Sequence, residues 1–550
     1  MKVYQALARA FAAEKVTEVF GMMGDGNLHW IDELDHLGVP TYEVRHESAG
    51  LNMAQGYARI SGKVGVATTT CGPGVTQLAT SMTIASRARA PIVVYCGESP
   101  TGDDDYVQRI NQQRFAEAIE AGFVRVTSSD VAVDCVRKAF YQARAESRPV
   151  MLSVPMDVAQ QDVDDNVIES YTPSSKMLQL RRVMPGPEDV TAAADLIAAS
   201  RKQVIVVGRG AMASAAGEQV LALAEQTGAL VVTTLMAKNW LNDYPFHAGI
   251  CGNYGSRTAR NLLAEADLVI AVGAGLNKYT TSGGALFPNA RYLQLDSARQ
   301  VVMGGGGTAS LYLQTDARLG LQAITAELDR RGFQAPGYHC EDTKRALAGS
   351  LDDPQSYELK PCTVDPREVC LLLDKMIPSD VGLVLGSGHN VYFSTMLCTK
   401  QRHLMLPNQF FGSIGQGLTS TIGAVVASKK PAFLIDGDVS LMMYLSEFET
   451  AVRYNLPILA VILNDQAMGT ELHKMRVHGL NAELAEIGSP DLGAVARALG
   501  GRGRLATTID DVRSSTEEWL ADPRPTMIDA RISDNVLSVQ YRRTHYGQDI

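Results

Sequence analysis

The sequence predicts an α/β protein with three doubly wound, parallel-sheet domains. Its length of 550 residues suits three domains. Short β-branched runs that suit buried strands alternate with helix-length segments along most of the chain. This alternation lapses twice, around residues 162–189 and 333–366, where prolines and acidic residues gather. We therefore expect domains over residues 1–170, 186–335 and 364–540.

The composition favours a cytoplasmic protein that handles small molecules. The net charge of −10 is spread without a long acidic or basic run, which argues against nucleic acid or a membrane as partner. The eight cysteines form no CxxC pair, so we expect reduced thiols and no zinc site. Residues 1–21 predict an amphipathic helix rather than a signal peptide, and no apolar run is long enough to cross a membrane.

The first domain contains two segments that end strands with chemically useful residues. Residues 42–62 read as a short strand that runs into a helix beginning at Glu47. An acid in a first helical turn is more often a cap that the helix dipole favours. Residues 20–28 form a strand-end loop with Gly24-Asp25-Gly26, which is typical of a turn. Asn52 follows this triplet, but we place it inside the helix, where it does not converge with Asp25.

The middle domain is predicted from four strand-like runs that alternate with helices. These runs cover residues 204–207, 230–234, 268–272 and 292–295. The first run is followed by a glycine turn that does not continue as a dinucleotide-binding fingerprint. The sequence therefore predicts a doubly wound middle domain without a recognisable nucleotide motif.

The last domain contains the most informative segment, a βαβ unit with an acid after each strand. Residues 432–435 and 456–463 suit buried parallel strands, and residues 446–454 suit the crossover helix. Parallel strands end at the same edge of a sheet, so Asp438 and Asp465 are expected to meet there. Carboxylates at such an edge suit Mg²⁺ or Ca²⁺, together with the phosphate oxygens of a ligand. The implied ligand is a diphosphate.

This unit resembles the cofactor motif of thiamine diphosphate enzymes of the acetolactate synthase, pyruvate decarboxylase and benzoylformate decarboxylase superfamily. The family motif is Gly-Asp-Gly followed by Asn-Asn, and this chain differs from it at Val439 and Asp465. The alternative is an ordinary βαβ unit with acidic loop caps. The resemblance implies pyrimidine-binding, central and diphosphate-binding domains, with thiamine diphosphate and Mg²⁺ as cofactors. It assigns the metal to Asp438, Asp465 and the main-chain carbonyl of Ala467, and the diphosphate to Gly437, Val439 and Ser440.

The same resemblance assigns further cofactor contacts. Glu47 would hydrogen-bond the aminopyrimidine ring and so activate the cofactor carbon. Ile414 would hold the cofactor in its bent form, and the carbonyl of Gly412 would hold its amino group. This loop is expected to follow a strand that ends at Phe411. Gly388 and His389 would contact the diphosphate, although a lone histidine there is more often structural.

Three residues carry the substrate-side hypotheses. Family members place an acid that transfers protons at Asp25, and an acid facing the reacting carbon at Glu471. In an apolar pocket, Glu471 would have a raised pKa and could protonate the intermediate left after CO₂ departs. Gln108 lies near the position of a substrate-facing glutamine, with Gln112 and Gln113 close by. The adjacent histidine pair of pyruvate decarboxylases is absent from residues 95–98.

The resemblance therefore predicts a lyase or ligase for a C–C bond of a 2-oxo acid. The favoured activity is non-oxidative decarboxylation with carboligation to an aldehyde acceptor. The alternatives are an acetolactate synthase-like carboligase or 2-hydroxyacyl lyase and, more remotely, a non-catalytic cofactor-binding protein. FAD is not expected, because residues 273–276 lack the arginine of flavin-binding relatives. A homotetramer is expected, with Glu47 and Asp438 of different subunits at one site. The tail, residues 536–550, is either a lid or a frayed surface segment, and we favour fraying.

Overall fold

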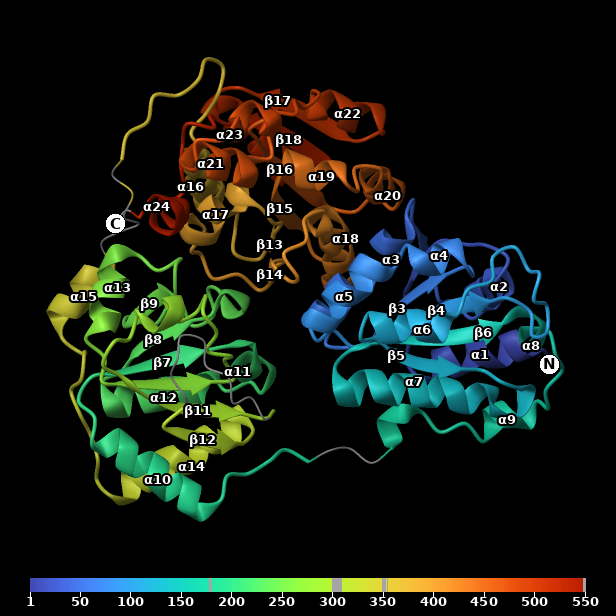
Figure 1. Ribbon diagram of the computed structural model, residues 1–550, viewed down its shortest axis with the longest axis horizontal. Helices are drawn as coiled ribbons and strands as arrows, with labels where there is room; N and C mark the ends of the chain where they lie inside the picture. Colours follow the sequence, from blue (N-terminus) through green and yellow to red (C-terminus); the bar gives the residue numbers. More distant parts are fainter. Residues whose placement is uncertain (178–180, 299–308, 349–352, 354, 548–550) are drawn as a thin grey trace.

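The computed structural model describes residues 1–177, 181–298, 309–348, 353 and 355–547. Within this part of the chain, three sheets of six strands each are present, and their strands are parallel. Figure 1 shows them as three lobes, with the N-terminal domain in blue, the middle domain in green and the C-terminal domain in orange and red. The prediction of three doubly wound α/β domains is confirmed. The predicted domain boundaries stay a prediction.

The N-terminal sheet has the strand order β2-β1-β3-β4-β6-β5. Its strands are β1 (Val19–Gly21), β2 (Thr41–Glu43), β3 (Gly65–Thr69), β4 (Ile92–Glu98), β5 (Gly122–Arg125) and β6 (Pro149–Pro155). Its helices are α1 (Val3–Ala13), α2 (Leu28–His36), α3 (Glu47–Ser61), α4 (Pro73–Thr76), α5 (Ala79–Arg87), α6 (Gln112–Ala118), α7 (Ala132–Glu146), α8 (Met156–Ala159) and α9 (Asn166–Glu169). The predicted helix start at Glu47 is confirmed, and Asn52 lies inside α3 as expected.

The middle sheet has the order β12-β11-β10-β7-β8-β9. Its strands are β7 (Gln203–Val207), β8 (Leu230–Thr233), β9 (His247–Ile250), β10 (Leu268–Val272), β11 (Arg291–Asp296) and β12 (Leu311–Gln314). Its helices are α10 (Pro187–Ala198), α11 (Arg209–Ala213), α12 (Gly217–Thr227), α13 (Arg257–Ala264), α14 (Ala317–Arg330) and α15 (Glu341–Ala348). All four predicted strands are present.

The C-terminal sheet has the order β14-β13-β15-β16-β18-β17. Its strands are β13 (Gly382–Leu385), β14 (Met405–Pro407), β15 (Ala432–Gly437), β16 (Ile458–Asn464), β17 (Arg502–Ala506) and β18 (Thr526–Arg531). Its helices are α16 (Pro366–Met376), α17 (His389–Leu397), α18 (Gln416–Ser428), α19 (Asp438–Met442), α20 (Glu447–Arg453), α21 (Gly469–Val477), α22 (Leu492–Ala498), α23 (Ile509–Ala521) and α24 (Val539–Tyr546).

Two local predictions for this domain are wrong. The strand expected to end at Phe411 ends at Pro407, because Phe411 has a left-handed backbone (φ 61°) that a strand cannot adopt. The tail is not frayed over residues 539–546, since α24 forms there and buries Tyr541 and Arg542. The Tyr541 hydroxyl donates to the main-chain oxygen of Thr470 (3.3 Å). The helix therefore lies against the start of α21.

The N-terminal and C-terminal domains are joined by close packing of α3 against α18. A Cβ added at Gly56 of α3 would overlap the main-chain oxygen of Ser420, and one at Gly423 of α18 would overlap that of Met53. Glycine at these two positions therefore allows the backbones of α3 and α18 to pack in direct contact. Buried apolar residues of both domains form one continuous cluster around this contact. Burial of this cluster makes the two domains a single folding core.

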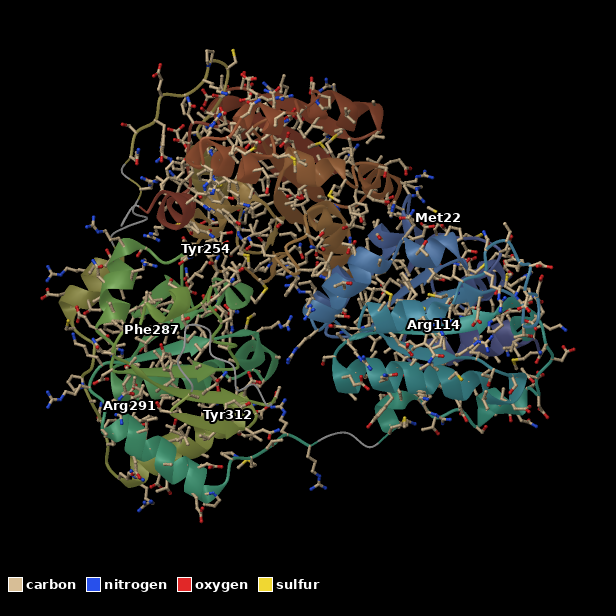
Figure 2. The ribbon with its side chains drawn as sticks, in the orientation of Figure 1. Met22, Arg114, Tyr254, Phe287, Arg291 and Tyr312 are labelled. Atoms are coloured by element: carbon tan, nitrogen blue, oxygen red, sulfur yellow. The ribbon has the colours of Figure 1, made fainter. Side chains whose placement is uncertain are left out.

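Polar contacts extend the joint between domains. The backbone N–H of Arg45 donates to Glu447 Oε1 (2.9 Å), and that of Glu43 donates to the Tyr454 hydroxyl (2.9 Å). Tyr254, labelled in Figure 2 where the middle domain faces the C-terminal domain, donates to Gln409 Oε1 (3.2 Å). Each domain thus shares hydrogen bonds with a neighbour. None of the helices in the described residues is long and apolar enough to cross a membrane.

The glycine contact between α3 and α18 predicts the sign of a stability change. Gly423→Ala and Gly56→Ala should each lower the free energy of unfolding by about 1–3 kcal/mol, because the added methyl group forces two helices apart. Urea denaturation followed by circular dichroism measures this change. Helix propensity alone favours alanine over glycine by about 1 kcal/mol. A gain in stability would therefore show that the helices are not in close contact.

Candidate functional site

The candidate site lies where the strand order of the C-terminal sheet reverses. The chain runs from β13 outward to β14 and then returns to the other side of β13 as β15. Open α/β sheets bind ligands at such a reversal, beyond the carboxyl ends of the strands. Asp438 starts α19 directly after β15, and Asp465 follows β16, the neighbouring strand. The predicted βαβ unit and the shared edge of its two acids are confirmed.

The two acids form a pair of carboxyl groups shielded from solvent, Asp438 buried and Asp465 half-buried, and the charge of Arg531 only partly offsets the effect of burial on Asp438. Asp438 is 2 % exposed, and its Oδ1 has no hydrogen-bond partner. Burial raises the pKa of the Asp438 carboxyl to about 7. Burial and repulsion from Asp438 raise the pKa of the Asp465 carboxyl to about 8. Loss of both protons at this edge therefore needs a compensating positive charge.

Amide and main-chain groups surround this pair. Asn390 Nδ2 donates to the main-chain oxygen of Leu463 (2.8 Å), which leaves the buried Asn390 Oδ1 without a partner. Asn390 Oδ1 and Asp465 Oδ2 both face Gly469, where a Cβ would overlap the carboxylate. Unpartnered hard oxygens are the ligands that Mg²⁺ takes in proteins. The residues present thus fit a divalent cation.

The described residues include no group of three or more His, Cys, Asp or Glu side chains that could hold a metal ion. A cation at this edge therefore needs amide, main-chain or ligand oxygens beside its two carboxylates. The backbone N–H of Ala467 donates to Asp465 Oδ1 (3.3 Å), so residue 467 turns back toward the acid. It remains a prediction that the carbonyl of Ala467 and the carboxylates of Asp438 and Asp465 bind a metal ion.

Asp436, which the sequence analysis did not single out, holds three loops of the site together. Its carboxylate accepts hydrogen bonds from the backbone N–H of Ser387 (3.3 Å), the backbone N–H of Gly437 (2.9 Å) and the Ser440 hydroxyl (2.9 Å). The Ser440 oxygen accepts in turn from the backbone N–H of Gly415 (2.9 Å). Burial raises the pKa of Asp436 to about 7. The sequence feature that could have identified Asp436 is its position directly before Gly437 and Asp438, at the end of an apolar run.

The predicted diphosphate contacts gather at this edge. Gly437, Asp438, Val439 and Ser440 form the turn from β15 into α19. Gly388 has a left-handed backbone (φ 112°) and precedes α17, which starts at His389. Backbone donors in such glycine turns suit anions. The proposed roles of these residues toward a diphosphate remain untested.

His389 is buried and is part of an aromatic cluster. It is 3 % exposed, its backbone N–H donates to Thr470 Oγ1 (3.1 Å), and its Nε2 accepts from the backbone N–H of Ser538 (3.3 Å). Its ring lies 4.4 Å from that of His473 and 4.6 Å from that of Tyr541. Burial and His473 hold the pKa of His389 well below its usual value. The histidine is therefore neutral and tied to the C-terminal helix.

The loop between β14 and α18 brings Gly412 and Ile414 to the same edge. Gly412 is exposed and left-handed (φ 66°), while Ile414 is half-buried. A Cβ at the following Gly415 would lie 3.1 Å from the Tyr444 ring and 3.2 Å from Met443. The loop is thus held on one side by Ser440, which is bound to Asp436, and on the other by the segment between α19 and α20.

Three of the predicted catalytic residues lie together in the N-terminal domain. Glu47 starts α3, and its Oε1 lies beside the tight turn at Gly74. Asp25 is exposed on the loop after β1. Gln108 Oε1 accepts from the Cys71 thiol (2.9 Å) beside the Gly72 turn. These groups share the edge formed by the β1 and β3 loops. The described contacts do not join them to the Asp438 edge of the same chain.

Glu471 does not lie in an apolar pocket, which corrects that part of its prediction. Its side chain is 49 % exposed and pairs with Lys474 (3.4 Å), one turn further along α21. Met468, three residues before Glu471, is also exposed. The side of α21 that carries Glu471 therefore faces solvent in this chain. Periodicity could not reveal this, because α21 has no marked apolar face.

Comparison with protein families matches each domain in turn. The N-terminal TPP binding domain of thiamine pyrophosphate enzymes matches residues 1–119, their central domain residues 190–324, and their C-terminal TPP binding domain residues 386–530. The chain therefore carries both domains that bind thiamine pyrophosphate, the compound also called thiamine diphosphate.

Similar proteins cover nearly the whole chain. A sulfoacetaldehyde acetyltransferase of Castellaniella defragrans is 28 % identical over 97 % of this chain and 92 % of its own length. A probable acetolactate synthase large subunit of Methanococcus aeolicus is 26 % identical over 96 % and 91 %. The acetolactate synthase isozyme 2 large subunit of Escherichia coli is 26 % identical over 96 % and 95 %. With three matched domains in order along one chain, the protein belongs to the thiamine pyrophosphate enzyme family.

Proposed function

We propose that this protein is a thiamine diphosphate- and Mg²⁺-dependent carboligase. It would release CO₂ from a 2-oxo acid and join the remaining acyl unit to the carbonyl carbon of a second substrate. The observation that carries the proposal is the unneutralised pair of Asp438 and Asp465 at the reversal of the C-terminal sheet. A buried and a half-buried acid at such an edge, in a domain of the family that binds this cofactor, support a metal-held diphosphate.

The chain's own residues would do four things. Asp438, Asp465 and the carbonyl of Ala467 would hold Mg²⁺, and the turns at Gly388 and Gly437 would present backbone donors to phosphate oxygens. Bound thiamine diphosphate supplies a carbon nucleophile and an electron sink. Glu47 would hold a proton at the aminopyrimidine ring, and Ile414 would fix the orientation of that ring. Gln108 and Asp25 would face the substrate.

The exposure of Glu471 favours ligation over simple decarboxylation. A carboxyl that is half exposed and paired with Lys474 is a poor proton donor to a buried carbon. The names of the similar proteins, acetolactate synthase and sulfoacetaldehyde acetyltransferase, also describe transfer to a second molecule. Non-oxidative decarboxylation is the second candidate, because decarboxylases of the family that this chain resembles carry acids at the positions of Asp25 and Glu471.

A dimer or tetramer would complete the site. Glu47 and Asp438 lie on edges that the described contacts do not join within one chain. We therefore propose that Glu47 of one subunit serves the Asp438 edge of another, with a homotetramer as the favoured assembly. An isolated monomer would then be inactive.

The products formed from 2-oxo acids test the proposal. The protein with thiamine diphosphate and Mg²⁺ should release CO₂ from a 2-oxo acid and form a 2-hydroxy ketone or acetohydroxy acid when an aldehyde or second 2-oxo acid is present. Gas release and chromatography of the products measure this. Release of aldehyde alone, with or without an acceptor, would favour the decarboxylase. No turnover of any 2-oxo acid would contradict both candidates.

Loss of the Glu47 carboxyl should stop turnover without loss of the cofactor. Glu47→Gln is expected to lower kcat at least about a hundredfold, because it removes a proton acceptor from the ring. Thiamine diphosphate should still bind, since the Asp438 edge is unchanged, and titration calorimetry checks this. Glu120→Gln, at an exposed acid of the same domain, is the control and should retain activity. Full activity of the Glu47→Gln variant would show that Glu47 has no catalytic role.

The pKa values of the acid pair predict how metal binding depends on pH. Burial raises the pKa of Asp438 to about 7 and, together with Asp438, that of Asp465 to about 8. Between pH 4 and 8 the folded protein then binds more protons than the unfolded chain, so the metal-free protein loses stability as pH rises. Mg²⁺ needs both carboxylates ionised. The increase in Tm on adding Mg²⁺ and thiamine diphosphate should be larger at pH 8.5 than at pH 6.

A matched variant separates this effect from other titrations. Asp465→Asn removes one acid of the pair and restores the residue of the family motif. The pH dependence of the Mg²⁺-induced shift should then become weaker, because only Asp438 must lose a proton. Thermal unfolding of both proteins at the two pH values measures the difference. An equal shift at both pH values in the unsubstituted protein would contradict the metal site.

A further inference from the structure

Two arginines of the N-terminal domain and one of the middle domain lie near one another, and no described carboxylate forms an ion pair with them. Arg59 lies in the last turn of α3, Arg89 lies between α5 and β4, and Arg209 starts α11 of the middle domain. Figure 1 shows α5, α11 and β14 on the sides of the three domains that face one another. We call these residues the three-arginine cluster. It is separate from the residues assigned above to the cofactor and substrate.

Two of these guanidinium groups share one aromatic ring. Arg59 Cζ lies 4.8 Å and Arg209 Cζ 5.9 Å from the centroid of Phe410, just after β14. Arg59 Nη1 donates to the main-chain oxygen of Pro407 (3.0 Å) and to Asn408 Oδ1 (3.1 Å). Arg209 Nη1 donates to the main-chain oxygen of Ala88. These hydrogen-bond acceptors are all neutral.

The cations repel one another. Burial and the charge of Arg209 lower the pKa of Arg59 to about 9. Burial and the charge of Arg89 lower the pKa of Arg209. Within the described ranges, no carboxylate forms an ion pair with Arg59, Arg89 or Arg209, whereas Arg87 pairs with Glu120 (3.5 Å). An unneutralised cluster at a domain junction costs stability unless an anion is present.

An unpartnered amide donor adjoins the cluster. Asn408 is fully buried, and its Oδ1 accepts a hydrogen bond from Arg59. The amide nitrogen of the same side chain, Nδ2, has no hydrogen-bond partner. A buried donor without an acceptor indicates that an acceptor belongs there.

We propose that the three-arginine cluster binds the phosphate group of a small molecule at the junction of the three domains. Phosphate offers up to two negative charges and several oxygens, which match three guanidinium groups and the amide nitrogen of Asn408. A halide or a carboxylate carries only one negative charge, and a halide has no set of oxygens to bridge separated donors. Phe410 gives the ligand an apolar wall beside these polar groups.

The position of this site couples it to the candidate active site. Phe410 lies two residues before Gly412 and four before Ile414, on the same loop. A phosphate held by Arg59, Arg89 and Arg209 would fix that loop against the N-terminal and middle domains. Bound anion should therefore alter cofactor affinity, and by reciprocity the cofactor should alter anion affinity. The inference itself does not depend on the reaction proposed above.

Calorimetric titration tests this site. The protein is first saturated with thiamine diphosphate and Mg²⁺, and inorganic phosphate or ADP is then added at an ionic strength held constant with NaCl. We expect one saturable site for phosphate. Arg59→Gln, Arg89→Gln and Arg209→Gln should each weaken binding about tenfold, since each removes a charge-assisted contact.

The control is Arg87→Gln, which removes an exposed arginine two residues from Arg89 and should leave binding unchanged. Arg89 is exposed, so its variant is expected to fold even if a buried arginine cannot be replaced. Tighter binding of ADP would identify a nucleotide phosphate, and equal binding would identify free phosphate. Absence of binding of both probes, or an equal loss in Arg87→Gln, would overturn the proposal.

Discussion

The arrangement of the whole molecule depends on the contact between α3 and α18. These helices begin at loops of the two candidate site edges, Glu47 on one and the Gly412–Gly415 loop on the other. Gly56 and Gly423 let the backbones meet, and the surrounding apolar side chains make one core from two domains. A helix pair that is rigid at this point sets the orientation of both edges at once. The orientation of both candidate edges is therefore a consequence of packing between the N-terminal and C-terminal domains.

Groups of like charge gather at two places in the described residues. Asp438 and Asp465 bring two carboxyl groups to one edge, and the three-arginine cluster concentrates positive charge at the junction of the domains. Arg402, by contrast, is a buried charge that pairs with Asp374 and donates to main-chain oxygens. Proteins leave buried charge uncompensated mainly where a ligand supplies the balance.

Patterns that depend on periodicity and strand ends were read correctly from the sequence. The β15, α20 and β16 unit and the helix start at Glu47 follow from apolar runs and local chemistry. Features that depend on contacts distant in sequence were not. The burial of Tyr541 in α24 involves Thr470, 71 positions away, and the role of Asp436 involves Ser387, 49 positions away, so local patterns do not encode either. The exposure of Glu471 was missed because α21 has no marked apolar face. The assignment of cofactor and substrate roles came from family resemblance.

Hydrogen bonds to Asp436 separate the candidate site into loops that cannot change independently and a helix face that can. Its carboxylate fills the space that side chains at Gly386 and Gly417 would need, and it fixes the loops of β13, β14 and β15 together. A change in any one of these loops would disturb the other two. The exposed side of α21 has no such tie. Substitutions on the exposed side of α21 should therefore be tolerated, while the loops joined by Asp436 tolerate little change.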